Sequence, residues 1–81
     1  MLIPEYFVVF PEGDIQEIPA RLPLNAVVGI DGRILGLPLP TSRMIAFRVH
    51  KIRVTESRGT NETFHYLELL SVEELLPYAR T

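Results

Sequence analysis

The chain has no cysteine among its 81 residues, and this absence removes several classes of site at once. Without a thiol it cannot form a disulfide, a zinc–thiolate centre, an iron–sulfur cluster or a cysteine nucleophile. The lack of disulfides also gives a slight preference for the reducing cytosol over an oxidising compartment.

The sequence has no long apolar run and no export signal. A membrane-spanning helix needs roughly 20 predominantly apolar residues, and no segment approaches that length. The apolar stretch Met1–Phe10 lacks a basic region and contains Pro4 and Glu5, which is wrong for a secretory signal. These absences predict a cytoplasmic protein with no membrane partner.

Catalytic and ligand-binding motifs are missing as well. Ser42, Ser57 and Ser71 all lie outside a Gly-x-Ser-x-Gly context, so no serine nucleophile is indicated. His50 and His65 are expected on adjacent strands but out of register, with no carboxylate at a matched spacing, so no metal site is indicated. We therefore expect a protein that is not an enzyme and uses no cofactor; an enzyme would need a site shared between subunits.

Apolar residues, by contrast, are abundant. The chain is 47% hydrophobic and its net charge is only −2, so it is too apolar and too weakly charged to be a disordered chain. Its length allows one hydrophobic core. Residues 1–81 are therefore expected to form a single small β-rich domain.

Short runs of β-branched and aromatic residues, separated by turn signals, predict a series of hairpins. The expected strands are Glu5–Phe10, Asp14–Ile18, Ala26–Ile30, Arg33–Leu37, one that begins near Met44, and Thr63–Leu70. The expected turns are Pro11–Asp14, a two-residue type I′ turn at Asp31-Gly32, and the loop Ser57–Glu62.

The strand that begins near Met44 has a break in its alternation. Apolar side chains recur with period two up to Val49 and resume one position out of phase at Ile52. A slip of this kind predicts a β-bulge near His50 or Lys51, which bends a strand around the corner of a barrel.

The C-terminal segment carries a helix signal. Ser71 and Glu74 have the spacing of a capping box, which predicts a short helix that runs to about Ala79 and is limited by Pro77. Together these patterns predict a mainly β fold: a small antiparallel barrel or roll of about five or six short strands with a short C-terminal helix. SH3-like and OB-like closures both fit, because local patterns carry no pairing order.

The leading hypothesis for function is an interaction domain that binds a protein partner, or forms a homodimer, through an apolar surface or a strand edge. Its motivation is a surplus of aliphatic residues around the proline segment and the C-terminus. The candidate partner-binding residues are Leu37, Leu39, Met44, Leu75 and Leu76. In the alternative explanation, the terminal helix covers the proline segment within one chain.

A second hypothesis comes from charge placement. The segment Arg43–Arg58 holds five cations against the single anion Glu56, although the whole chain is acidic. This pattern could bind single-stranded RNA or DNA, with cations on the phosphates and an aromatic ring on a base. The candidate contacts are Arg48, Lys51, Arg53, Arg58 and Tyr66. Alternatively, Glu62 and Glu68 on the neighbouring strand neutralise these cations.

Overall fold

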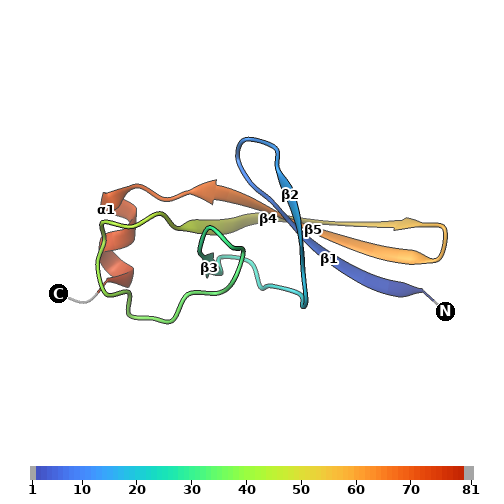
Figure 1. Ribbon diagram of the computed structural model, residues 1–81, viewed down its shortest axis with the longest axis horizontal. Coiled ribbons are helices and arrows are strands. Elements are labelled where there is room, and N and C mark those ends of the chain that lie inside the picture. The colour runs from blue at the N-terminus through green and yellow to red at the C-terminus, as the bar shows by residue number, and fades with distance from the viewer. Residues whose placement is uncertain (1, 80–81) are drawn as a thin grey trace.

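The computed structural model describes residues 2–79, and it is mainly β (Figure 1). The elements are β1 (Ile3–Val9), β2 (Ile15–Ile18), β3 (Val27–Val28), β4 (Phe47–Ser57), β5 (Thr60–Leu69), the helix α1 (Val72–Leu75) and the 3-10 helix η1 (Leu76–Tyr78). The strands form one curled sheet in the order β2-β1-β5-β4-β3. This arrangement confirms the expected class, a small β roll with a short C-terminal helix.

The pairing of β1 with β5 is parallel, whereas every other strand pair in the sheet is antiparallel. The prediction that the strands pair antiparallel is therefore correct for the hairpins and wrong for the central pair, β1 and β5. The reason is that β1 and β5 are far apart in sequence. Turn chemistry dictates the direction of adjacent strands only, so it says nothing about this pair.

The β1–β2 hairpin has the expected turn. Gly13 adopts φ 102°, a left-handed conformation that glycine tolerates, and its amide donates to the carbonyl of Phe10 over 2.8 Å. The amide of Phe10 in turn donates to the carbonyl of Asp14. The strand β1 begins at Ile3, two residues before the expected start.

The β4–β5 hairpin turns more tightly than expected. Arg58 and Gly59 have positive φ values of 43° and 86°, and Ser57 pairs directly with Thr60. Two consecutive positive φ values are the mark of a two-residue type I′ turn, so the expected loop over residues 57–62 is wrong. An arginine at the first turn position hid this turn, because the usual signal there is Asn, Asp or Gly.

The β-bulge in β4 is confirmed. The register shifts between Val49 and Lys51, which leaves His50 as the extra residue. Because of this shift, Arg48 and Lys51 lie on the same face of the sheet. The strand itself begins at Phe47, three residues after the expected start.

The turn around Asp31-Gly32 differs from the expectation. The amide of Gly29 donates to the carbonyl of Arg33, and the amide of Gly32 donates to the carbonyl of Gly29, both over 3.0 Å. The loop therefore has three residues, with Gly32 at φ 77°, and it is not the expected two-residue turn. The returning segment 33–37 forms only an isolated bridge through Ile34, because the prolines that follow draw it away from the sheet.

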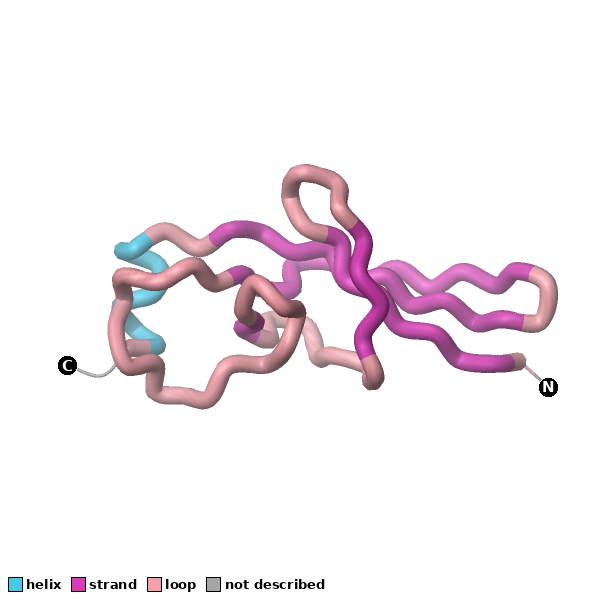
Figure 2. Tube along the Cα trace, in the orientation of Figure 1, coloured by secondary structure: helices cyan, strands magenta, loops and turns pink. Residues whose placement is uncertain are grey.

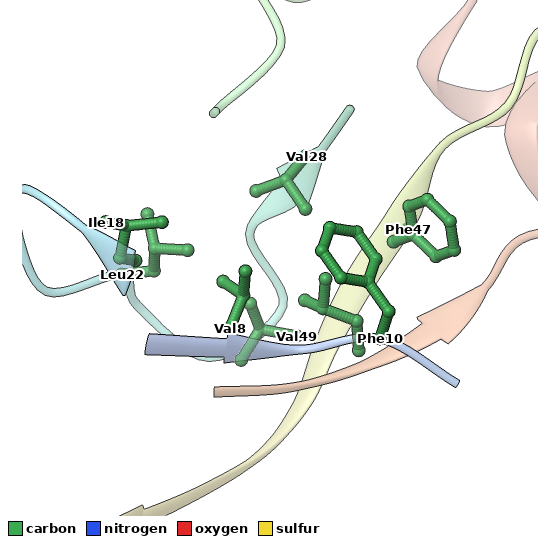
Figure 3. Packing of buried hydrophobic residues seen from close by; sticks show 8 residues of the cluster. Val8, Phe10, Ile18, Leu22, Val28, Phe47 and Val49 are labelled. Carbon is green, nitrogen blue, oxygen red and sulfur yellow. The ribbon is translucent and has the colours of Figure 1, made fainter. Parts of the chain in front are cut away.

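One face of the sheet, which we call the inner face, carries the main core. The segment between β2 and β4 folds over this face (Figure 2). The buried side chains that meet there, most of them drawn in Figure 3, are Val8, Phe10, Ile18, Leu22, Val28, Phe47, Val49 and Leu67.

A second core lies where the helix meets the proline segment. Its buried side chains are Val27, Leu39, Ala46, Leu70 and Leu75. The amide of Leu39 donates to the carbonyl of Tyr78 over 2.7 Å, which ties the proline segment to the end of η1. The helical turn therefore covers the proline segment within a single chain.

The fold is elongated, with principal extents of 47 × 22 × 17 Å. The tip of the β4–β5 hairpin lies at one end of the long axis and α1 lies at the other (Figure 1). Within residues 2–79, no helix has the length and apolar character needed to cross a membrane.

Candidate interaction surface

Within residues 2–79, no segment covers the centre of the sheet face opposite the core, which we call the outer face. Strand alternation and the pairing register assign its residues. They are Glu5, Phe7, Val9, Ile15, Glu17, Arg48, Lys51, Arg53, Thr55, Glu62, Phe64, Tyr66 and Glu68. Each is exposed or half-buried, which is why this face is open to a partner.

Two aromatic rings stack at the centre of the outer face. Phe7 of β1 and Phe64 of β5 are register partners, and their ring centroids are 5.1 Å apart at an interplanar angle of 17°. The next register pair, Val9 and Tyr66, extends the apolar stripe. Val9, Phe64 and Tyr66 line a shallow hollow together with Ile15 on β2, which is 59% exposed.

The cations of β4 lie beside this stripe. Lys51 places its Nζ atom 5.8 Å from the centroid of the Tyr66 ring, a cation–π distance. Arg53 is the register partner of Phe64 and is exposed. The sheet therefore brings Lys51, Arg53 and Tyr66 together on one open face, as the sequence pattern predicted.

Arg48 is on the same face but is already paired. Its Nη2 and Nε atoms donate to Oε2 of Glu68 over 2.8 and 2.9 Å, which is one of the expected cross-strand pairs. The hydrogen bond to Glu68, followed by one to Tyr78, raises the pKa of Arg48 above its ordinary value. Arg48 thus links β4 to β5, and its charge is paired with Glu68 within the chain.

The last candidate for an anion contact sits differently from the others. Arg58 lies in the hairpin turn, beyond the strand residues that form the outer face. Glu62, the second carboxylate expected to pair with the cations, accepts a hydrogen bond from the hydroxyl of Thr55 over 3.5 Å instead.

The candidate apolar contacts divide into buried and exposed side chains. Leu39 and Leu75 are 1% and 0% exposed, so their assignment to a partner surface is wrong: both are buried where the helix covers the proline segment. Leu37 and Leu76 are 57% and 56% exposed, and Met44 is half-buried. Only these last three can contact a partner in this fold.

The loops offer a second apolar area, part of which lies among the aliphatic residues that the sequence groups around the proline segment. Ile30, Leu35, Met44 and Ile45 line one open hollow together with backbone of the turn at residues 29–31. Ile30 and Ile45 are 69% and 60% exposed.

His65 has a structural role that the sequence did not indicate. Its ring is fully buried, Nδ1 donates to the carbonyl of Phe7 over 2.8 Å, and Nε2 accepts from the amide of Leu22 over 3.0 Å. Both ring nitrogens are therefore occupied by backbone partners, which leaves neither free for a ligand. His50, at the bulge, is exposed on another part of β4.

The aromatic stripe was only half visible in the sequence. Strand alternation in Thr63–Leu70 places Phe64 and Tyr66 on one face, but only the parallel β1–β5 pairing connects Phe7, Val9 and Ile15 with them. A signal was nevertheless present: Tyr6–Phe10 is apolar at every position, whereas a strand with one solvated face usually alternates.

The fold and its open face together define a small mainly β protein with an exposed aromatic stripe on a single sheet. The chain belongs to the family described as "Uncharacterised Treponema protein", which matches residues 2–78. No curated protein and no solved structure matches the chain significantly.

Proposed function

We propose that this protein is a non-enzymatic interaction domain that binds a protein partner or a second copy of itself through the outer face of its sheet. The observation that carries the proposal is the uncovered apolar stripe. A sheet face exposed to water is ordinarily polar, yet this one presents Phe7, Phe64 and Tyr66 side by side with Val9 and Ile15.

The surroundings of the stripe support binding to a protein. Charged residues flank the apolar centre, with Glu17 on the β2 side and Lys51 and Arg53 on the β4 side. An apolar centre with a polar rim is the usual anatomy of a protein interface. The outer edge of β4 is hydrogen-bonded by residues 25–28 only as far as Val49, so the part of the strand beyond it offers a second route through strand addition.

In this proposal the protein acts in the cytoplasm and uses no cofactor or metal ion. It is supported by the absence of thiols in the sequence. His65 adds further support, because both of its ring nitrogens contact backbone groups.

Light scattering after size-exclusion chromatography, over a concentration series, tests this proposal. We expect Phe64→Gln to weaken association at unchanged folding, because it replaces the central ring of the stripe with a polar side chain. Leu37→Glu and Leu76→Glu are matched controls at exposed positions away from the sheet. Loss of association in these controls alone would move the contact to the proline segment and contradict the choice of surface.

Single-stranded nucleic acid is a second candidate ligand. The specific observation in its favour is that Lys51 and Arg53 lie beside Tyr66 and Phe64 on an open sheet face, where bases could stack and phosphates could be neutralised. This function predicts that the protein binds a short single-stranded RNA and that the affinity falls steeply as the salt concentration rises. It also predicts that Lys51→Gln lowers this affinity. Binding that is absent or independent of salt would exclude it.

A further inference from the structure

The central row of the outer face has an unusual order of side chains. Reading across β2, β1, β5 and β4, the register places Glu17, Phe7, Phe64 and Arg53 next to one another. An acid stands at one side, a base at the other, and two stacked rings lie between them. The row therefore reverses in charge about its own midline, which lies between Phe7 and Phe64.

A pattern of this kind is complementary to itself. Rotation by 180° about an axis parallel to the strands exchanges the β2 side with the β4 side and turns one face onto another. Glu17 of each copy then opposes Arg53 of the other, and the Phe7–Phe64 stack opposes the same stack. A two-fold axis perpendicular to the strands would instead set the β4 cations against themselves, which is unfavourable.

We propose that the outer face binds a second copy of this chain, with the two-fold axis parallel to the strands and between β1 and β5. The inference rests on the proposed function and names its partner and geometry. It makes two equivalent Glu17–Arg53 contacts and one apolar centre, as an isologous interface requires.

The neighbouring rows delimit the contact. Towards the β1–β2 turn, Val9 of one copy opposes Tyr66 of the other, and this extends the apolar centre. Towards the hairpin tip, Glu5 and Glu62 are register partners and would face carboxylates of the other copy. Because twisted sheets diverge away from their point of closest packing, the contact is confined to the two apolar rows.

The same acids weigh against nucleic acid as the occupant of this face. A strand of phosphates that tracked Lys51 and Arg53 across the sheet would meet Glu17, Glu5 and Glu62. A second copy of the chain uses both signs of charge, with Glu17 on Arg53. The charge pattern therefore favours a second copy of the chain over a nucleic acid on this face.

Charge reversal tests the geometry directly. We would measure the dimer Kd by sedimentation equilibrium for the wild type, Glu17→Arg, Arg53→Glu and the double variant that carries both. Each single change places like charges in contact at two symmetric positions, and we expect the Kd to rise by at least about tenfold. The double variant restores opposite charges, so its Kd should return towards the wild-type value.

Glu56→Arg is the matched control. It makes the same substitution on β4, but its alternation places it on the inner side of the hairpin, away from the outer face. We expect it to leave the Kd unchanged. The near-ultraviolet circular dichroism of every variant reports whether the fold is retained.

The outcomes separate this inference from the proposed function. A dimer that Phe64→Gln weakens but whose double charge variant fails to recover would overturn the two-fold arrangement and leave self-association through the outer face in place. A wild-type protein that stays monomeric up to about 1 mM would overturn the inference. If such a monomer bound single-stranded RNA at low salt, the second candidate function would be favoured instead.

Discussion

His65 joins three separate segments of the fold. It sits on β5 and uses its two ring nitrogens to hold the carbonyl of Phe7 on β1 and the amide of Leu22 in the segment that covers the core. A buried polar group is tolerated when its hydrogen bonds are satisfied, and losing one side of such a bond leaves the other side unpaired. His65 is therefore a structural link between these segments.

We predict that His65→Ala destabilises the fold by about 3 kcal/mol, because it leaves two backbone groups unpaired and opens a cavity. The measurement is urea denaturation. His50→Ala, at an exposed position, should change the free energy of unfolding by no more than about 0.5 kcal/mol. Equal midpoints for the two variants would show that the hydrogen bonds of His65 contribute nothing to stability.

Glu74 sets a pH dependence at the start of α1. The backbone amide of Ser71 donates to its carboxylate over 3.0 Å, and this bond, followed by the one from the Ser71 side chain, lowers the pKa of Glu74 below its ordinary value of 4.5. A lowered carboxyl pKa means that the ionised form stabilises the folded state. That contribution is complete above the ordinary value and is lost as the pH falls through the lowered one.

We therefore predict that the wild type is more stable than Glu74→Gln at neutral pH and that this difference shrinks as the pH falls below the ordinary carboxyl value of 4.5. Thermal unfolding at a series of pH values provides the comparison. A difference that is constant with pH, or that grows on acidification, would contradict the role of the ionised capping box.

At the scale of elements, the β4–β5 hairpin depends on its two-residue turn. Gly59 adopts φ 86°, and a side chain there would be strained although it would meet no atom within 4 Å. The cost of Gly59→Ala is therefore conformational, at about 1 kcal/mol.

Gly36 supplies the matched comparison for this prediction. It also has open space around its Cβ position, but its φ is not left-handed, so Gly36→Ala should be neutral or slightly stabilising. Urea denaturation of both variants distinguishes them. If both substitutions cost the same, backbone conformation does not account for the effect at Gly59.

The elements differ in how well the sequence predicts them. The β1–β2 hairpin, the bulge at His50 and the capped helix were predictable because each depends on residues close together in the chain. The strands expected around Val27–Val28 and Ile34 are shorter in the structure. Val27 and Val28 pack into the two cores without extending a ladder, and Ile34 is exposed and forms a single bridge. Local patterns do not tell such residues apart from those of a ladder.

At the scale of the whole molecule, the least predictable feature is the one that creates the candidate surface. The parallel pairing of β1 with β5 joins Phe7 to Phe64, and it depends on how the chain returns after a long excursion. The cations of β4 were recognised in the sequence, but not the acid at Glu17 that faces them across the sheet. The charge pattern of the outer face exists only once the strand order is known.

Substitutions on the outer face should affect binding and stability to different extents. The outer face contributes no buried side chain to either core, so polar substitutions there should alter association far more than folding. We expect Phe64→Gln to lower the free energy of unfolding by less than about 1.5 kcal/mol. Parallel denaturation and light-scattering measurements check this, and a variant that simply unfolded would place Phe64 in the core instead.

The most direct test of the central claim uses the absence of native cysteine. Within one chain, positions 17 and 53 are three strand spacings apart, or about 14 Å, which is too far for a disulfide, whose Cα atoms lie within about 7 Å of each other. In the proposed dimer, position 17 of one copy faces position 53 of the other. The measurement is disulfide formation in a mixture of Glu17→Cys and Arg53→Cys proteins under mild oxidation. The account predicts that the mixture cross-links rapidly to a mixed dimer while each variant alone stays largely uncross-linked; cross-linking that is equally fast in either variant alone, or absent from the mixture, would contradict it.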